Sequence, residues 1–383
     1  MDRIERMMFD LLRYECSGSW RGSVISPEDT APLFRLTKKH ELSHLAADAL
    51  EKLGFLSGSP CEGLFETRLF DAHYRYERYQ HAFEQIGQWF EREKICYIPL
   101  KGLVLRSLYP EPWMRTGCDM DILVREEDFT RARKILTQQL SYQQGQQTRH
   151  DVSFSSADGV CVELHFLLVE ENRAGSAGAV LARIWEYAHP VVPGAYQYAM
   201  TDEAFFLYHI AHMAKHFEQG GCGIRSVLDL WLMEQRGCYW NDVTISLLRK
   251  SGLLTFANAV CDLARVWFEN AEPTPLLLQA EEYILHGGIY GSTDQRYTVY
   301  QYRAGGKGRY VLSRIFLPRG EMVCQYPILQ RHRWMLPAFR IARWFSLLAG
   351  PKARAGKAAV QNIQNVTDEQ ISRVSNLLNS LGL

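Results

Sequence analysis

Residues 95–124 read ICYIPLKGLVLRSLYPEPWMRTGCDMDILV and contain the features that decide the fold. Apolar runs predict strands at 95–100 and 118–124, with a short helix after Lys101 and Gly102. Successive strand side chains alternate between faces, so Asp119 and Asp121 should point the same way. Adjacent carboxylates repel unless a cation lies between them, and Mg²⁺ prefers such oxygen ligands. The alternative is a solvated acid pair on an exposed edge strand.

A second apolar strand at 160–166 carries one more acid, Glu163, and His165 two residues later on the same face. Asp158 and Gly159 precede it and are typical of a hairpin turn after a short strand near 152–155. The pattern predicts a small mixed sheet with helices on one side. His165 could then contact a phosphate or the acceptor, or hydrogen-bond to one of the acids.

These motifs resemble the polymerase-β-like nucleotidyltransferase superfamily. Lys101-Gly102 followed by Arg115-x-Gly-x-Asp-x-Asp-Ile-Leu-Val is similar to a bacterial family of uncharacterised nucleotidyltransferases within it. The resemblance covers about 120 residues strongly and the following helices more weakly. It implies Asp119, Asp121 and Glu163 as catalytic metal ligands. Lys101 and Gly102 stand where the superfamily usually has Gly-Ser or Gly-Gly.

The resemblance implies a metal-dependent enzyme that moves a nucleoside monophosphate from an NTP, with ATP the first candidate, to a hydroxyl of a sugar, small molecule or protein. Two Mg²⁺ ions are the expected cofactors, with Mn²⁺ as a substitute. The alternative is a catalytically silent nucleotide-binding or scaffold protein of the same fold. Nucleic acid is not an expected partner, because 43 basic and 43 acidic residues give zero formal charge.

Two cationic residues near the acid pair have two interpretations each. Lys101 either contacts the β- and γ-phosphates or is a solvated lysine at a helix start. Arg115 either reaches the triphosphate or pairs with a carboxylate to support the structure. Backbone N–H groups after Gly102, where a helix is expected to begin, could also hold phosphate.

The helices after the predicted core contain further candidates. By the resemblance, His216, Arg225 and Asp229 line the nucleotide or acceptor cleft. The alternative for Arg225 and Asp229 is a simple pair four residues apart on one helix. His209, His212 and His216 also share a helix face, which suggests zinc, but ordinary helical histidines fit this spacing better because a closed zinc site needs a fourth ligand.

The chain is predicted to be α+β and mostly helical, with a nucleotidyltransferase core between helical domains. We expect a helical region at 1–84, the core at 85–200, a helical domain at 201–350, and a linker with a C-terminal helix at 351–383. Within the first region, 33–53 is expected to be helical. The aromatic stripe of a long helix at 64–93 is interpreted as core. A capping box at Thr367 and Gln370 begins the last helix.

The remaining features concern location and surface. Nine cysteines without a Cys-x-x-Cys pair indicate reduced, buried thiols. No signal-peptide pattern and no long apolar run is evident, so a cytoplasmic protein without a membrane span is expected. Residues 331–357 are basic and aromatic; this region could contact RNA or an anionic membrane, but a solvated basic face is favoured. Oligomeric state is not predictable from the sequence.

Overall fold

The acid pair and its partner strand lie at the centre of a five-stranded mixed sheet with the order β1-β2-β5-β4-β3. The structure is a computed structural model that describes residues 1–168, 175–237, 239–289, 291–348 and 360–383. Strand β2 pairs parallel with β5, whereas the other neighbouring strands pair antiparallel. The strands are β1 (Tyr97–Pro99), β2 (Met120–Val124), β3 (Gln143–Gln147), β4 (Asp151–Ser155) and β5 (Cys161–His165).

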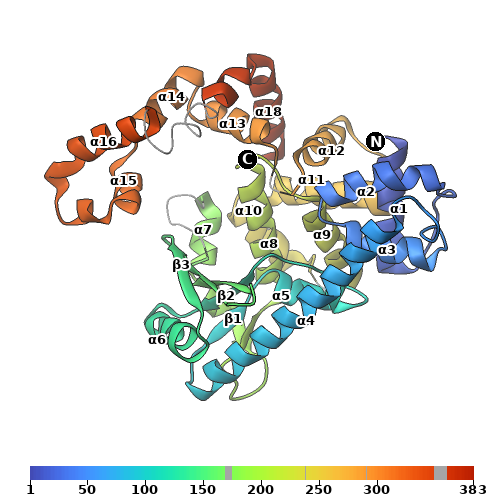
Figure 1. Cartoon of the computed structure of the whole chain (residues 1–383), viewed down its shortest axis with the longest axis horizontal. Helices are drawn as coiled ribbons and strands as arrows, with labels where there is room; N and C mark the ends of the chain where they lie inside the picture. Colours follow the sequence, from blue (N-terminus) through green and yellow to red (C-terminus); the bar gives the residue numbers. More distant parts are fainter. Residues whose placement is uncertain (169–174, 238, 290, 349–359) are drawn as a thin grey trace. The chain divides into compact units, whose positions relative to one another are not determined.

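Two helices, α4 (Glu62–Arg92) and α6 (Phe129–Lys134), cover one face of this sheet (Figure 1). Strand alternation sends Met120, Ile122 and Val124 of β2 to that side, where they join one buried core. The same alternation leaves Asp121 and Leu123 on the opposite face. The predicted mixed sheet is therefore confirmed, and Asp121 and Glu163 lie on the face away from α4 and α6.

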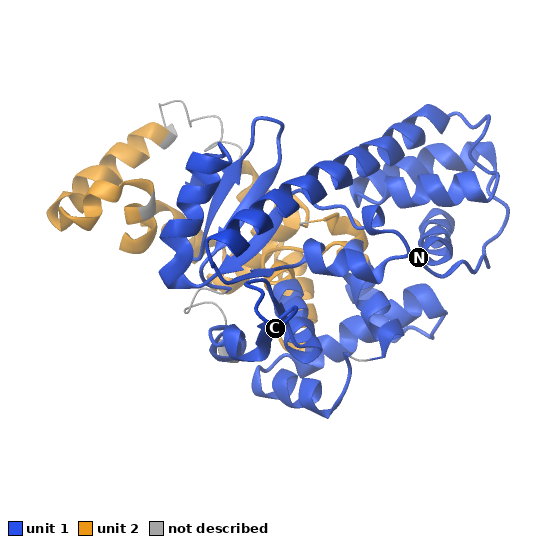
Figure 2. Ribbon diagram, turned by 90° about the horizontal axis from the view of Figure 1, so that it is seen from below, with its two compact units in different colours: residues 1–214, 224–281 blue, residues 215–223, 282–383 orange. Residues whose placement is uncertain are grey.

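Helix α4 connects the N-terminal helices with the sheet (Figure 2). Its first half packs on the helices before it, where the rings of Phe34 and Phe65 meet edge to face at 5.0 Å. Its second half buries Ile86 and Phe90 against the sheet. The aromatic stripe is thus core, as predicted. The N-terminal helices are α1 (Arg3–Ser17), α2 (Thr30–Lys39) and α3 (Ser43–Lys52).

The described chain forms two compact units, coloured separately in Figure 2. Unit 1 comprises residues 1–214 and 224–281, and unit 2 comprises 215–223 and 282–383. The four-part division at residues 84, 200 and 350 stays a prediction. Besides short 3-10 and π turns, the α-helices and strands that follow up to residue 287 are α5 (Gly102–Leu105), α7 (Gly175–Leu181), β6 (Ala188–Pro190), β7 (Tyr198–Met200), α8 (Asp202–Phe217), α9 (Ile224–Arg236), α10 (Asp242–Lys250), α11 (Leu254–Glu269) and α12 (Pro275–Gly287).

The later part of unit 2 is helical. The capping box predicted for the last helix is present: the Thr367 side chain accepts from the Gln370 amide, and the Gln370 side chain accepts from the Thr367 amide. Much of the predicted linker, residues 351–359, lies outside the described residues. The helices are α13 (Thr293–Arg303), α14 (Lys307–Ile315), α15 (Arg319–Gln325), α16 (Leu336–Leu348) and α18 (Asp368–Leu381).

Local structure differs from the sequence prediction in two places. The helix expected at 33–53 is broken between α2 and α3, where Glu41 adopts a left-handed φ of +53°. The polar stretch at 143–147 forms strand β3, which alternation of hydrophobicity could not reveal because all five of its residues are exposed. Strand β3 pairs with β4 at the edge of the sheet.

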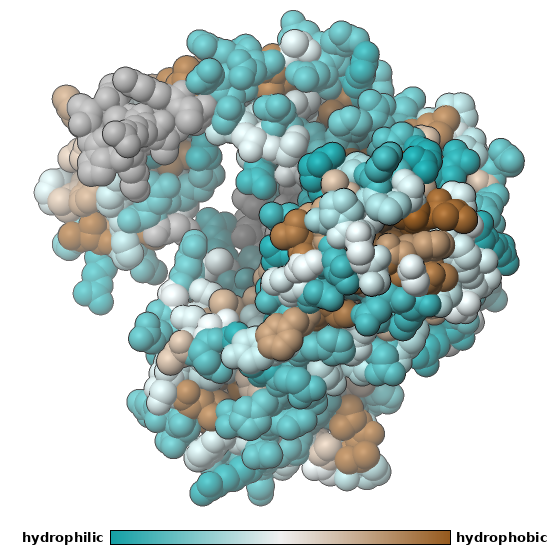
Figure 3. Space-filling model, turned by 45° about the vertical axis from the view of Figure 1, so that its right-hand side comes forward, coloured by the Kyte–Doolittle hydropathy of each residue, from teal (hydrophilic) through white to brown (hydrophobic). Residues whose placement is uncertain are grey.

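The surface of the molecule and its cysteines bear on the remaining predictions. The face drawn in Figure 3 is largely hydrophilic, with hydrophobic residues in several separate groups. Within the described residues, no helix has the length and apolar character needed to cross a bilayer. Seven cysteines in the described part of the chain form no disulfide, and two of them, Cys118 and Cys161, are exposed rather than buried, because they stand where β2 and β5 enter the sheet.

Candidate metal and nucleotide site

Strands β2 and β5 bring Asp121 and Glu163 side by side. The parallel register pairs Asp121 with Glu163 and Leu123 with His165, so the acids and the imidazole share one face. His165 Nε2 lies 2.8 Å from Asp121 Oδ1 and 3.7 Å from Glu163 Oε2. The ligand atoms of these three residues all lie within 4.8 Å of one another. We call Asp121, Glu163 and His165 the acid–histidine cluster.

Lys101 reaches the same cluster from the turn between β1 and α5. Its Nζ lies 2.8 Å from Asp121 Oδ1. The turn is fixed to β2 because the Leu100 amide donates to the Asp121 carbonyl at 3.0 Å. Lys101 itself has φ +45° and ψ −119°, a backbone conformation that residues other than glycine rarely adopt. The Lys101 ammonium thus contacts a carboxylate rather than being a solvated helix-start lysine.

The charges in this cluster shift one another's pKa values. Burial acts to raise the pKa of Asp121, but Lys101 and His165 overcome it and hold that pKa well below its usual range. Burial, followed by the charge of Asp121, raises the pKa of Glu163 to about 7. The same two causes raise the pKa of Asp119. The carboxylates of Asp119, Asp121 and Glu163 therefore repel one another more than the nearby cationic side chains compensate. A bound divalent cation would relieve this repulsion.

Asp119 stands just before β2, at a position that Tyr79 of α4 fixes. The Tyr79 hydroxyl donates to the Cys118 carbonyl at 2.7 Å and accepts from the Cys161 amide at 3.2 Å. One side chain thus ties the starts of both central strands to α4. Asp119 lies outside strand β2, which begins at Met120, and it is not among the three residues whose ligand atoms lie within 4.8 Å of one another, although the charge of Asp121 acts on it.

Arg115 is held away from solvent by Asp229 of α9. The guanidinium Nε and Nη2 donate to both carboxylate oxygens at 2.8–3.1 Å, and Nη1 donates to the Thr116 carbonyl at 2.7 Å. Tyr109 Oη also donates to Asp229 at 2.8 Å. Of the two interpretations of Arg115, the contacts match structural pairing with a carboxylate, since all three nitrogens are engaged.

The contacts of Arg225 do not match the alternative of a simple pair with Asp229. Arg225 donates from Nη1 to the Thr116 carbonyl at 2.9 Å and lies 3.8 Å from Glu41 Oε2. Gly102 begins α5 beside Arg115, whose Nη1 would lie 3.7 Å from an added Cβ. Arg115 and Arg225 therefore both brace the loop that leads into the acid strand.

The helical histidines do not assemble into a metal group among the described residues. His209 is buried in unit 1, with Nε2 3.1 Å from the Ser226 carbonyl. His216 belongs to unit 2. The zinc interpretation of His209, His212 and His216 is thus not supported.

Three residues near the cluster escaped sequence reasoning. Asp151 pairs across the sheet with His165, and His150 immediately precedes Asp151. The sequence spacing of these residues does not indicate that they meet, because the antiparallel pairing of β4 with β5 brings them together. Tyr208 of α8 is buried, and its pKa is raised by burial and by the nearby acids, against the opposing effect of Lys101. Helix α8 therefore lies close to the acid face.

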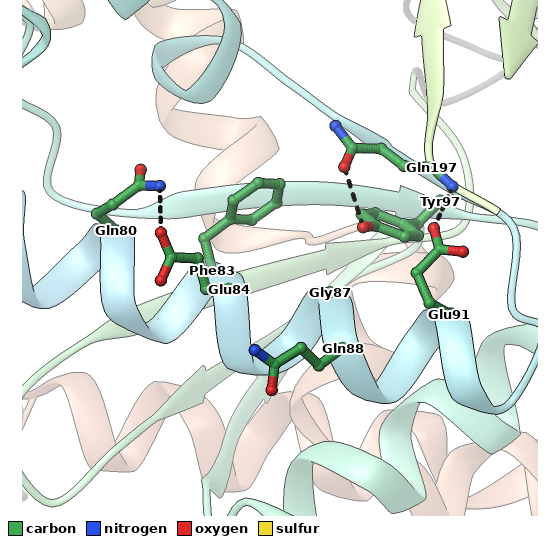
Figure 4. Close-up of a pocket in the computed structure, with 8 residues that line it drawn as sticks. All are labelled: Gln80, Phe83, Glu84, Gly87, Gln88, Glu91, Tyr97 and Gln197. Carbon is green, nitrogen blue, oxygen red and sulfur yellow. Dashed lines mark hydrogen bonds between the residues drawn. The ribbon is translucent and has the colours of Figure 1, made fainter. Parts of the chain in front are cut away.

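A hollow of about 490 Å³ occurs elsewhere, between α4 and β1 (Figure 4). Several of its polar side chains are engaged in structure: Glu91 accepts from the amides of Tyr196 and Gln197, and the Tyr97 hydroxyl donates to Gln197 Oε1. Gly87 permits this approach, since an added Cβ would lie 2.9 Å from the Tyr97 hydroxyl. The hollow is a packing feature of the β1 edge and holds none of the acids.

Comparison with known proteins places this arrangement in a family. A family model described as "Uncharacterised nucleotidyltransferase" matches residues 26–269, which include the whole five-stranded sheet and helices α4, α8 and α9. The chain belongs to this nucleotidyltransferase family. Neither a curated protein nor a solved structure matches it.

Proposed function

We propose that the chain is a divalent-metal-dependent nucleotidyltransferase that moves a nucleoside monophosphate from an NTP, with ATP as the first candidate, to a hydroxyl acceptor. The observation that carries the proposal is the pairing of Asp121 with Glu163 across two central parallel strands. Asp119 adds a third carboxylate two residues from Asp121. Family membership supports the same reaction class.

The donor set fits hard divalent cations. Asp119, Asp121 and Glu163 would hold two Mg²⁺ ions, and Mn²⁺ would bind the same oxygens. When bound, the ions would neutralise charge on the phosphate oxygens during transfer. The raised pKa of Glu163 supports this assignment, because a carboxylate crowded by Asp121 gains stability when positive charge is added.

In the proposed reaction, the acceptor oxygen bonds to the α-phosphorus while the bond from that phosphorus to the oxygen bridging to the β-phosphorus breaks. Pyrophosphate leaves with the electron pair of that bond. Glu163, as a proposed ligand of the second ion, would favour the deprotonated form of the acceptor hydroxyl, whose proton would leave to solvent. Lys101 would turn from Asp121 toward the β- and γ-phosphates, as a flexible point charge can.

One contact favours the silent alternative. The Lys101 ammonium already neutralises Asp121 at 2.8 Å, so in a silent relative this lysine could supply permanently the positive charge that a metal would otherwise bring. That protein would bind nucleotides with little dependence on metal.

The test incubates the protein with each α-labelled NTP, Mg²⁺ and a cell extract, and follows label in acceptors. Wild type and Glu127→Gln, an exposed acid on the same unit, should transfer label. Asp121→Asn and Glu163→Gln should lower the rate of label transfer by about 100–1,000-fold, the scale seen when central charge-stabilising groups are removed. Equal labelling by Asp121→Asn, or metal-independent NTP binding without transfer, would overturn the proposal; the second outcome identifies the silent protein.

A further inference from the structure

On the side of His165 away from the proposed catalytic acids lies a second group of metal-ligand side chains. Asp151 Oδ2 is 3.0 Å from His150 Nε2 and 4.0 Å from His165 Nδ1. The ligand atoms of the three residues all lie within 4.8 Å of one another. Asp151 and His165 are buried, and His150 is half-buried. We call His150, Asp151 and His165 the His–Asp–His group.

The hydrogen bonding of His165 leaves one ring nitrogen without a partner. Its Nε2 lies 2.8 Å from Asp121 Oδ1, and a carboxylate can only accept, so Nε2 carries the hydrogen. Its Nδ1 is buried and has no hydrogen-bond partner among the residues that the structure describes. At 4.0 Å, Asp151 Oδ2 is too far away to form a hydrogen bond with it. In the neutral imidazole Nδ1 then carries a lone pair, and this nitrogen and the Asp151 carboxylate oxygen face one another across a gap that suits a cation.

We propose that the His–Asp–His group is a binding site for Zn²⁺ or a chemically similar borderline divalent metal, separate from the proposed Mg²⁺ ligands. Two imidazoles with one carboxylate form a donor set that Mg²⁺ disfavours and zinc prefers. Ligands about 2.0–2.1 Å from a tetrahedral zinc lie about 3.3–3.4 Å from each other, and the two observed separations bracket that value. Three protein ligands leave the fourth position open for water or substrate.

The surroundings already provide the outer hydrogen bonds that metal ligands need. Zinc-bound histidines usually donate their second ring N–H to a carboxylate or similar acceptor, as His165 does to Asp121. Thr148 orients the other two ligands, since its Oγ1 donates to Asp151 Oδ1 at 2.8 Å and lies 3.2 Å from His150 Nδ1. The alternative without metal is an ion pair between protonated His150 and Asp151.

The zinc site would orient Asp121 through His165, and would thereby link the two metal groups. The inference does not depend on the transfer reaction, because the ligands would bind zinc whether or not the acids catalyse. Zinc binding is therefore measured directly, and transfer is a separate readout.

The experiment strips the full-length protein with a chelator and titrates it with Zn²⁺ by calorimetry. X-ray absorption at the zinc edge then reports the ligands. One equivalent should bind tightly in wild type, with two imidazoles in its coordination shell. Asp151→Asn and His150→Ala should weaken binding by at least about 100-fold, and Thr148→Val by about 10–100-fold as expected for an outer-shell residue.

Controls separate this site from the catalytic proposal and from misfolding. His189→Ala removes an exposed histidine elsewhere in the unit, and Asp119→Asn removes a proposed Mg²⁺ ligand; both should bind zinc as wild type does. Circular dichroism must show native helix content in each variant. Zinc affinity unchanged in Asp151→Asn, or no binding below about 10 µM in wild type, would overturn the site. A wild-type protein that binds zinc but does not transfer the nucleotide label would contradict only the transferase proposal.

Discussion

The ammonium of Lys101 lies 2.8 Å from the carboxylate of Asp121, and Lys101 reaches it from a backbone with a φ of +45°. A residue other than glycine in such a conformation costs on the order of 1–3 kcal/mol. The contact with Asp121 opposes that cost, because the attraction to Asp121 raises the pKa of Lys101 even though burial acts to lower it. The chain therefore keeps a lysine where glycine would fit more easily, which indicates that its charge is needed.

The strain and the charge at position 101 can be separated by two substitutions. Lys101→Ala and Lys101→Gly both remove the ammonium, but only glycine adopts the left-handed conformation without strain. We expect Lys101→Gly to be more stable than Lys101→Ala by about 1 kcal/mol in urea unfolding, with both below wild type because Asp121 loses its partner. If alanine proved the more stable of the two, the turn would not be strained.

Lys101 also competes with any metal for Asp121 Oδ1. Removing the ammonium should therefore raise the affinity of the nucleotide-free protein for Mn²⁺ by about 10-fold, since each 1.4 kcal/mol of lost competition is one factor of ten. Electron paramagnetic resonance of free Mn²⁺ measures this directly in Lys101→Ala, with the exposed Lys134→Ala as control. Affinity at or below that of wild type would show that the lysine does not occupy the metal position.

Glu163 gives the metal-free protein a defined pH dependence. Its pKa is about 7 in the folded protein, against an ordinary value of 4.5. Between these values the folded state keeps a proton that the unfolded chain has lost, so stability falls as pH rises through the window. Glu163→Gln should remove this slope and be more stable than wild type above pH 7, with the difference vanishing near pH 4.5.

Thermal melts from pH 4.5 to 8 in the presence of a chelator test this expectation, with Glu127→Gln as the matched exposed control. Adding Mg²⁺ should reverse the order at pH 8, because only wild type keeps the full ligand set. A wild-type curve that runs parallel to that of Glu163→Gln across the window would show that Glu163 titrates normally in the fold.

The sequence predicts the acid face better than its surroundings. Alternation along one strand predicts the face of Asp121, whereas Asp119 falls just before that strand, and the hairpin signal at Asp158-Gly159 leads correctly into the strand of Glu163. The sequence does not show that this strand pairs in parallel with β2. The alternation of apolar residues nevertheless restricts the register, because a slip by one residue would move the apolar side chains out of the core. His150 and Asp151 could not be foreseen, because their approach to His165 depends on which strands pair, and strand β3 offered no apolar pattern at all.

Long-range ion pairs are the other part that the sequence conceals. Arg115 and Asp229 are 114 residues apart. The sequence allowed Arg115 to pair with a carboxylate but did not indicate which one, and it offered a local pair between Arg225 and Asp229 as one alternative. Local spacing is a weak guide here because a pair four residues apart on a helix surface contributes only about 0.3–0.5 kcal/mol. A buried carboxylate instead takes whichever donors enclose it, here Arg115 and Tyr109.

The Arg115–Asp229 pair yields the sharpest stability prediction. Asp229 is fully buried and Arg115 nearly so, so Asp229→Ala leaves an unpaired buried charge and should destabilise the protein by about 3–5 kcal/mol. Removing the exposed Arg68–Asp71 pair by Arg68→Ala should cost less than about 1 kcal/mol. Urea unfolding of both variants measures the difference.

A double substitution then decides what Arg115 does. Replacing a buried ion pair by apolar side chains of similar volume is often nearly neutral, so Arg115→Met with Asp229→Leu should recover much of the stability lost in Asp229→Ala. If Arg115 only braces the loop before β2, this stable double variant should keep NTP affinity within about threefold of wild type. Recovered stability with a large loss of NTP affinity would instead mean that the guanidinium leaves Asp229 to meet the triphosphate, because only a direct contact would be lost while the loop stayed folded.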